Sequence, residues 1–214
     1  HLWKNKERHI LENQIVNKGK LPANLDPNNE ESYINYNQKD YAPTLIHQEA
    51  LKFIERNKDE KFFVYYASPI PHLPLQAPAI WVNYYREKFG EEKPYTGGSG
   101  YYPNQYPKAT YAAMISYLDQ QVGELVKKLK EIGKDENTLI IFSSDNGPTH
   151  VKHVDIDFFD SAGPFLNSEN TVKGNLNEGG IRVPTIATWP KVIAAGSESN
   201  HPSIFYDYLA TISD

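Results

Sequence analysis

Apolar residues along this chain recur with a helical period in separate regions. The clearest region lies past the middle of the chain, where apolar positions three and four residues apart predict an amphipathic helix that ends at Gly133. These positions are Met114, Ile115, Leu118, Val122, Leu125, Val126, Leu129 and Ile132. An earlier helix is expected from the capping residue Thr44 to about Arg56, and a last amphipathic segment begins near Ser203. The long apolar stripe is typical of core packing and not of a cofactor site.

Three shorter apolar runs predict β-strands at residues 61–67, 138–144 and 182–189. The run 138–144 is β-branched and almost uninterrupted, which is typical of a strand buried on both faces of a parallel sheet. Helices and strands alternate along the chain, and this order predicts an α/β fold with a mostly parallel sheet flanked by helices. Residues 1–43 show little periodicity and are expected to form an irregular surface segment. A loop as long as 147–180 is often functional.

Composition narrows the classes of partner. The 214 residues suggest one domain, or one and a part, and their 22 basic and 27 acidic side chains form no basic stripe, so a nucleic-acid partner is not expected. No apolar run approaches the length of a membrane span. Cysteine is absent, which excludes a disulfide framework, a thiol nucleophile and a zinc–thiolate site within these residues. The chain opens on His1 and stops within an expected helix, so we expect it to be part of a longer protein.

An acid and an amide follow the most strongly apolar of the predicted strands. Asp145 and Asn146 come directly after the run 138–144. Ligands bind beyond the carboxyl ends of strands in open α/β sheets, and both side chains offer the hard oxygen atoms that calcium prefers. The alternative is an ordinary Asn-Gly turn. The pair is therefore a candidate for part of a metal site.

Two further residues have the chemistry to act on an anion. His72 lies in a proline-rich loop after the first predicted strand, and Lys173 lies in the segment 171–184 before the last one. Lys173 would neutralise the non-bridging oxygens of an oxyanion ester as a point charge, and His72 would donate either to the leaving oxygen or to the anion. Taken singly, each residue has a simpler interpretation, as an ordinary loop histidine and a solvated lysine.

Two other motifs carry less weight. His150 and His153, with Asp155 and Asp157, offer ligands for zinc or another transition metal, but they are expected in a loop and not on a helix. The glycines of 97–100 do not follow a strand with the spacing of a phosphate-binding loop, so nucleotide binding is not favoured.

Three blocks of sequence resemble successive motifs of the type I sulfatases, which belong to the alkaline phosphatase-like superfamily. The blocks are Pro-His-Leu-Pro-Leu-Gln-Ala-Pro at 71–78, Ser-Asp-Asn-Gly-Pro at 144–148 and Lys-Gly-Asn-Leu-Asn-Glu-Gly-Gly-Ile-Arg-Val-Pro at 173–184. The likeness extends from Leu2 to the end of the chain. It implies the α/β fold of that superfamily, a bound calcium ion and hydrolysis of sulfate esters, often on sugars.

The resemblance also implies roles for individual residues. Asp145 and Asn146 would be calcium ligands. His72 and Lys173 would contact the sulfate group, with His72 near the leaving oxygen. Residues 150–168 are similar to the substrate-lining loop of arylsulfatases and N-acetylgalactosamine-6-sulfatases, which makes His150 a candidate sugar contact.

The chain departs from the family pattern at the nucleophile. Type I sulfatases carry a Cys/Ser-x-Pro-x-Arg motif whose first residue is converted to formylglycine, and this chain has no such motif. The paired aspartates that complete the calcium site are absent too, and both features belong to the amino-terminal half of the family. We therefore expect residues 1–214 to be the central to C-terminal part of a sulfatase catalytic domain. This part is expected to be inactive without the missing amino-terminal half, and the whole protein to be periplasmic or secreted.

Two other functions remain open from the residues alone. A phosphomonoesterase or phosphodiesterase of the same superfamily would also use Lys173 and His72, because phosphate and sulfate esters are both tetrahedral anions. Those enzymes usually hold two transition metals, whereas an Asp-Asn pair suits calcium better. A non-catalytic carbohydrate-binding module would instead stack sugars on a platform of exposed tyrosines. The candidates for that platform are Tyr84, Tyr85, Tyr95, Tyr101 and Tyr102.

Overall fold

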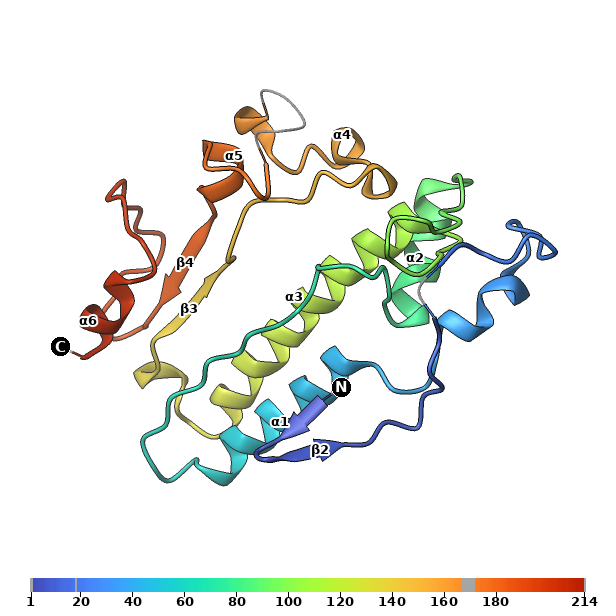
Figure 1. Cartoon of the computed structure of the whole chain (residues 1–214). Helices are drawn as coiled ribbons and strands as arrows, with labels where there is room; N and C mark the ends of the chain where they lie inside the picture. The colour runs from blue at the N-terminus through green and yellow to red at the C-terminus, as the bar shows by residue number, and fades with distance from the viewer. Residues whose placement is uncertain (1, 18, 167–171, 214) are drawn as a thin grey trace.

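The computed structural model describes residues 2–17, 19–166 and 172–213 (Figure 1). Thr171 and Ser168, which end two of the segments discussed above, lie outside this part. The helices and strands in chain order are β1 (Leu2–Lys4), β2 (Glu7–His9), α1 (Ala42–Arg56), α2 (Ala79–Phe89), α3 (Pro107–Glu131), β3 (Ile140–Ser143), α4 (Ile156–Phe159), α5 (Glu178–Ile181), β4 (Thr185–Thr188) and α6 (Asp207–Ser213).

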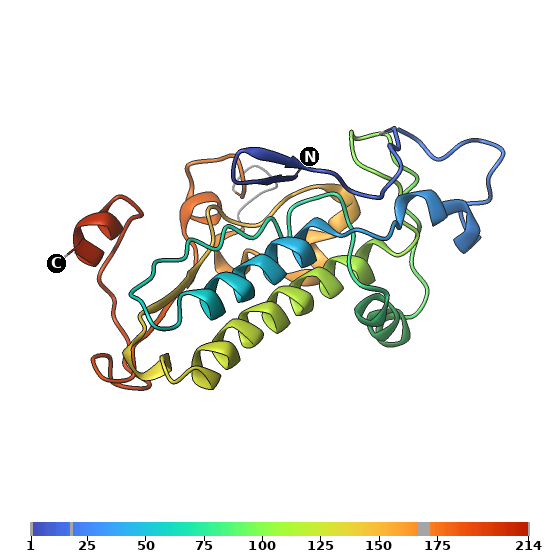
Figure 2. The same cartoon turned by 90° about the horizontal axis from the view of Figure 1, so that it is seen from below.

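Helix α3 is the central element of the fold. It begins at Pro107, a residue that suits the first helical position because its missing N–H would have no partner there. The predicted end is confirmed, since Gly133 has a φ of 67° and its N–H donates to the Lys130 carbonyl at 3.0 Å. The N–H of Lys134 donates to the Leu129 carbonyl at 2.9 Å, which completes a Schellman cap. Helix α1 runs beside α3 in both views (Figures 1 and 2).

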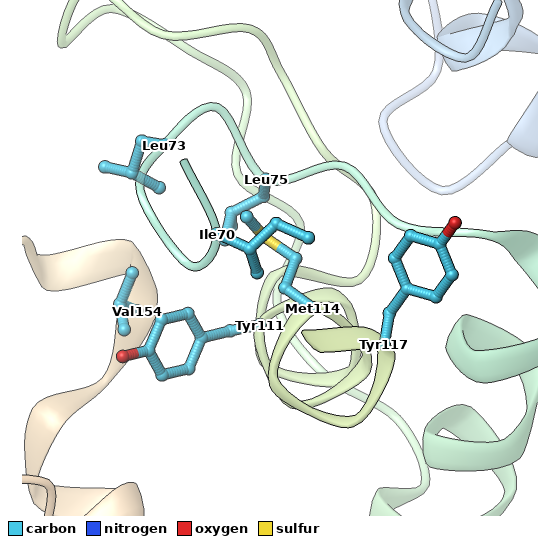
Figure 3. Packing of buried hydrophobic residues seen from close by; sticks show 7 residues of the cluster. All are labelled: Ile70, Leu73, Leu75, Tyr111, Met114, Tyr117 and Val154. Atoms are coloured by element: carbon cyan, nitrogen blue, oxygen red, sulfur yellow. The ribbon is translucent and has the colours of Figure 1, made fainter. Parts of the chain in front are cut away.

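The main hydrophobic cluster joins α3 to two loops. Its buried residues are Ile70, Leu73, Leu75, Tyr111, Met114, Tyr117 and Val154. Figure 3 shows the loop that carries Ile70, Leu73 and Leu75 lying over one side of α3, and Val154 approaches from the 3-10 helix Lys152–Val154. The proline-rich loop that contains His72 is thus fixed by its apolar neighbours on both sides.

The predicted helix 44–56 is confirmed at its end but not at its start. Helix α1 begins at Ala42 after Tyr41, and Thr44 lies inside its first turn. The Thr44 hydroxyl lies 2.7 Å from the Tyr117 hydroxyl of α3 instead of capping α1. The prediction of Thr44 as a cap was wrong because this hydroxyl pairs between helices, and Pro43 supplies the helix start.

A polar network ties the segment 61–67 to both long helices. The ring of His47, which is 4% exposed, has its Nε2 2.8 Å from Oε2 of Glu124. The Tyr66 hydroxyl donates to Oε1 of the fully buried Gln121 at 3.1 Å. Burial alternates residue by residue through 61–67, as in a strand, but this segment has no strand partner in the described part of the chain. The predicted strand is therefore not formed as a sheet member here.

The mostly parallel sheet that was predicted is not seen among the strands that the structure describes. Strands β3 and β4 pair antiparallel, from Ile140 opposite Thr188 to Ser143 opposite Thr185. Nor is β3 buried on both faces, since Phe142 is 38% exposed. The pairing is antiparallel because the long connection returns the chain to the point where β3 ends, so that β4 starts beside Ser143 and runs back.

Two other parts of the chain differ from expectation. Residues 1–43 are not wholly irregular, because β1 and β2 form an antiparallel hairpin and residues Glu30–Tyr36 form a 3-10 helix. Helix α2 was not expected, although Pro78 before it and Gly90 after it are ordinary boundary signals. The glycine-rich segment serves close packing: a Cβ on Gly97 would lie 2.2 Å from the Gly19 carbonyl oxygen.

Candidate functional site

The block 144–148, which carries the candidate metal ligands, meets the block 173–184, which carries the candidate cation, at the end of β3. The N–H of Gly147 donates to the Gly180 carbonyl at 2.9 Å, and the N–H of Lys173 donates to the Pro148 carbonyl at 3.0 Å. The Ser143 hydroxyl also donates to the Pro184 carbonyl at 3.0 Å. Segments about thirty residues apart in the sequence are thereby held side by side (Figure 1).

Glycine makes this approach possible. A Cβ on Gly147 would lie 1.9 Å from the Gly179 carbonyl oxygen, far inside van der Waals contact. A Cβ on Gly180 would lie 2.1 Å from the Asn175 carbonyl oxygen and 2.8 Å from that of Val172. Neither position requires a left-handed backbone, so these glycines are selected by space and not by φ.

Asp145 and Asn146 present oxygen atoms at this junction. The Asp145 side chain is exposed, and no hydrogen bond to its carboxylate is found in the described part of the chain. The amide nitrogen of Asn146 donates to the Gly147 carbonyl at 3.2 Å, which leaves its Oδ1 as an acceptor. A carboxylate and an amide oxygen suit calcium, but calcium takes six to eight oxygens in all. Among the residues the structure describes, no group of three or more His, Cys, Asp or Glu side chains gathers, so these two residues provide only part of such a site.

Lys173 belongs to the same junction through its backbone. Its backbone bond to Pro148 fixes where the side chain starts, and the residue is half-buried. The next cation along the segment, Arg182, is held in an ion pair with Glu178 at 2.9 Å. Within residues 2–17, 19–166 and 172–213, no ion pair to Lys173 is formed. Lys173 is therefore the cation of this edge that is available to an anionic ligand.

The His72 ring has a defined tautomer. Its Nδ1 lies 2.8 Å from the Leu73 carbonyl, which can only accept, so Nδ1 carries the proton. The edge of the ring meets Tyr101, with ring centroids 6.5 Å apart. Nε2 is left to take up or release a proton, which is the arrangement that general acid–base chemistry needs.

The structure brings some of the predicted residues together and leaves others apart. Asp145, Asn146 and Lys173 share one junction. Among the described residues, His72 makes no direct contact with these three. Its neighbour Leu73 packs in the same hydrophobic cluster as Val154, which lies eight residues after Asn146 in the chain. Two surface hollows, of about 490 and 720 Å³, lie elsewhere, on the hairpin and beside α2.

The alternative transition-metal site is contradicted within the described residues. The His153 ring stacks on Tyr95 with centroids 3.8 Å apart and planes at 12°. Asp155 caps α4 by accepting from the Phe158 N–H at 3.1 Å. These side chains serve packing and capping, and no three potential ligands converge around them in this part of the chain. His150 is exposed in the loop that leads to them.

The proposed tyrosine platform is not formed either. Tyr101 packs against the main hydrophobic cluster, and the Tyr102 hydroxyl donates to the Val16 carbonyl at 3.2 Å. Tyr85 and Ser116 hydroxyls pair at 2.7 Å, whereas Tyr84 is 43% exposed. The Tyr84 and Tyr85 rings meet each other, with centroids 5.1 Å apart, whereas Tyr95 and Tyr101 both contact the ring of His153, so the tyrosines are engaged in packing contacts instead of one open platform.

The Sulfatase family model matches residues 5–214. The chain belongs to the Sulfatase family. This confirms the family predicted from the three sequence blocks and favours sulfate-ester chemistry over the phosphatase and sugar-binding alternatives. The fold is accordingly part of the alkaline phosphatase-like α/β fold, although the parallel sheet is not seen in the described strands.

Individual relatives cover most of this sulfatase chain but only part of their own length. An uncharacterised sulfatase of Schizosaccharomyces pombe is 28% identical over 253 residues, which cover 89% of this chain and 44% of that protein. Human N-acetylgalactosamine-6-sulfatase is 29% identical over 165 residues, covering 77% of this chain and 26% of that protein. The crystal structure of Ps i-CgsB in complex with k-i-k-neocarrahexaose superposes with a TM-score of 0.58 at 30% identity, covering 78% of this chain and 32% of that one. The chain thus spans less than half the length of these relatives.

Among the helices of residues 2–17, 19–166 and 172–213 of this sulfatase chain, none combines the length and the apolar character that crossing a bilayer requires.

Proposed function

We propose that the protein containing this chain hydrolyses sulfate esters of sulfated sugars, and that this chain supplies the sulfate-binding and part of the calcium-binding side of the site. The observation that carries the proposal is the pair of backbone bonds that holds Asp145 and Asn146 against the Lys173 segment. The relatives support the substrate class: one is named N-acetylgalactosamine-6-sulfatase, and a similar structure is in complex with a neocarrahexaose.

The residues of the chain have separate roles in this proposal. The Lys173 ammonium neutralises the negative charge of the non-bridging sulfate oxygens. As the ester bond breaks, negative charge increases on the bridging oxygen. His72, with Nδ1 committed to the Leu73 carbonyl, donates a proton from Nε2 to the leaving sugar oxygen. The exposed His150 contacts the sugar ring or its substituents.

Calcium fits the donor set at the junction. Asp145 and Asn146 would hold the ion with a carboxylate and an amide oxygen, and the remaining ligands would come from residues outside this chain. When bound, calcium polarises the sulfate group. The formylglycine nucleophile of the family likewise belongs to the amino-terminal half, so we propose that residues 1–214 are one part of a longer catalytic domain. We also propose an extracytoplasmic location, the periplasm or outside the cell, where sulfated polysaccharides are met.

The parent protein tests this function directly. The full-length protein should release 4-methylumbelliferone from its sulfate ester much faster than from its phosphate ester. Residues 1–214 alone should release it from neither. Preference for the phosphate ester would overturn the proposal, as would turnover of the sulfate by residues 1–214 alone.

A further inference from the structure

The chain contains one Asn-Gly dipeptide, Asn146-Gly147, and it lies at the junction of the blocks 144–148 and 173–184. Deamidation of asparagine meets the least steric hindrance before glycine, because glycine has no Cβ to block the approach of its own nitrogen to the preceding side chain. The Asn146 side chain is half-buried, and its neighbours Ser144 and Asp145 are exposed, so water reaches this turn. Sequence and exposure together make Asn146 chemically labile.

Deamidation here would be an intramolecular attack followed by hydrolysis. The backbone nitrogen of Gly147 loses its proton and attacks Cγ of Asn146. The new N–C bond closes a succinimide ring, and the side-chain nitrogen of Asn146 leaves as ammonia. Water then opens either carbonyl of the ring, which gives aspartate or isoaspartate, and in isoaspartate the main chain runs through the former side chain. The reaction consumes water alone and needs no oxidant or reductant.

The fold engages the nitrogen that would attack. The N–H of Gly147 donates to the Gly180 carbonyl at 2.9 Å, so removal of its proton breaks a backbone hydrogen bond. Gly147 is buried, and the Gly179 carbonyl oxygen lies 1.9 Å from where its Cβ would stand. The amide nitrogen of Asn146, which would leave, donates to the Gly147 carbonyl at 3.2 Å. The closed junction therefore opposes the reaction that the sequence favours.

We propose that Asn146 is a site of spontaneous deamidation that the hydrogen bond between Gly147 and Gly180 keeps latent and that opening of the junction releases. The rate of deamidation then follows the fraction of time for which the junction is open, as for other reactions that need local unfolding. Both products place a carboxylate where the amide stood, next to Asp145. Isoaspartate also adds a methylene to the main chain before Gly147, so the junction does not close again as before.

The modification has a consequence for activity, and this consequence alone rests on the proposed function. Asn146 is a proposed calcium ligand through its amide oxygen, and isoaspartate moves that position relative to Asp145 and Lys173. Turnover of 4-methylumbelliferyl sulfate by the full-length protein should therefore fall in step with the isoaspartate that accumulates at position 146. The protein would lose activity with age wherever the junction opens.

The substitution His201→Gly in the full-length protein tests the protection within one folded molecule. It places a second glycine after an asparagine, Asn200, in an exposed loop where the N–H of residue 201 donates to the Ser199 hydroxyl, a side chain that can rotate away. The masses of proteolytic peptides report deamidation at both sites after incubation in slightly alkaline buffer. Asn200 should deamidate at least about tenfold faster than Asn146, equivalent to ~1.4 kcal/mol for opening the junction. Equal rates at the two sites would overturn the proposal.

Adding Gly180→Ala to this protein assigns the protection to the junction. The new Cβ would lie 2.1 Å from the Asn175 carbonyl oxygen, so the substitution separates the blocks and leaves the dipeptide at 146–147 unchanged. The rate at Asn146 should rise to near the rate at Asn200. A rate at Asn146 that stays slow in the folded variant would overturn the proposal.

Gly123→Ala is the control, because alanine fits at that position of α3 and should leave deamidation of Asn146 slow. Circular dichroism shows whether the Gly180→Ala protein is folded. If it is not, the comparison of Asn146 with Asn200 in the folded His201→Gly protein decides. Peptide masses do not depend on sulfatase activity, so failure of the unaltered protein to cleave a sulfate ester would refute the proposed function and leave this inference standing.

Discussion

The N–H of Gly147 donates to the carbonyl of Gly180 at 2.9 Å, across a gap too narrow for any side chain. This bond joins the block that follows β3 to the block that precedes β4. Because Asp145 lies two residues before Gly147, and Lys173 is bonded through its own N–H to Pro148, these contacts set where the backbones of Asp145 and Lys173 lie relative to each other.

A Cβ at position 147 should separate the two blocks. In Gly147→Ala the new methyl group would lie 1.9 Å from a backbone carbonyl oxygen, which cannot rotate away as a side chain would. We expect the free energy of unfolding to fall by about 2–3 kcal/mol, as for other severe steric substitutions. Urea denaturation of the full-length protein measures the change, and calcium-dependent stabilisation should weaken in parallel.

Gly123→Ala is the matched control for that substitution. Gly123 lies inside α3 with open space around its Cα, so alanine fits and favours the helix. Its stability should rise by about 0.5–1 kcal/mol. Equal destabilisation by the two substitutions would show that the close approach of the backbone at position 147 is not the reason that position 147 requires glycine.

Glu92 is expected to stabilise the start of α3. Its carboxylate accepts from the N–H of Lys108 and from that of Ala109 at 3.0 Å, although it lies fifteen residues before the helix. Glu92→Ala leaves two donors unpaired at a helix N-terminus and should cost about 1–2 kcal/mol in thermal or urea unfolding. Burial raises the pKa of this carboxyl, so Glu92→Gln, which keeps an acceptor without the charge, should cost less. The exposed neighbour Glu91 provides the control, and Glu91→Ala should have little effect.

His153 should make stability depend on pH below neutrality. Burial lowers the pKa of this imidazole from its ordinary 6.5, and its Nε2 is buried without a hydrogen-bond partner in the described residues. The unfolded chain therefore binds a proton at a higher pH than the folded chain does. Stability is fully present above pH 6.5 and is lost as the pH falls through the folded pKa.

The variant His153→Phe tests this assignment. Phenylalanine keeps the stacking on Tyr95 and removes the titrating nitrogen. Urea midpoints measured between pH 7 and pH 5 should fall less in the variant than in the unaltered protein. An identical pH dependence in both proteins would assign the effect to other groups.

His72 should matter most for poor leaving groups. Protonation of the leaving oxygen is needed for a sugar alkoxide and much less for a phenolate, which leaves readily. His72→Ala in the full-length protein should therefore lower kcat by about 100-fold or more on a sulfated sugar, and far less on an aryl sulfate. Equal losses on both substrates would indicate a binding role instead of proton donation.

The sequence predicted those elements whose signals are local. The apolar stripe from Met114 to Ile132 located α3, and Gly133 located its end, because both depend on the helix itself. Pairing of β3 with β4 depends on a connection of about forty residues, and nothing local to either strand states its direction. A continuous apolar run was therefore assigned to a parallel sheet although its partner runs antiparallel.

The sequence identified the residues of the candidate site but not their arrangement in space. Asp145 and Asn146 were identified from their place after a predicted strand, and Lys173 from its charge, with motif likeness in support; their shared junction became visible only with the backbone bonds in place. Gly147 and Gly180 were in the same motifs, but a close approach cannot be distinguished from a turn by glycine content alone. Tyr101 contacts His72 from a loop, and no periodic pattern in the sequence indicates which segment that loop packs against.

Binding of the ester anion by Lys173, at the junction with Asp145 and Asn146, is the step on which the proposed function depends most. Its most direct measurement is kcat/KM of the full-length protein for 4-methylumbelliferyl sulfate, compared between Lys173→Ala and Lys191→Ala, an exposed lysine beyond β4. We expect Lys173→Ala to lower kcat/KM by about 100-fold or more, as for loss of a group that stabilises transition-state charge, and Lys191→Ala to leave it unchanged. Equal activity of the two variants would contradict this role of Lys173.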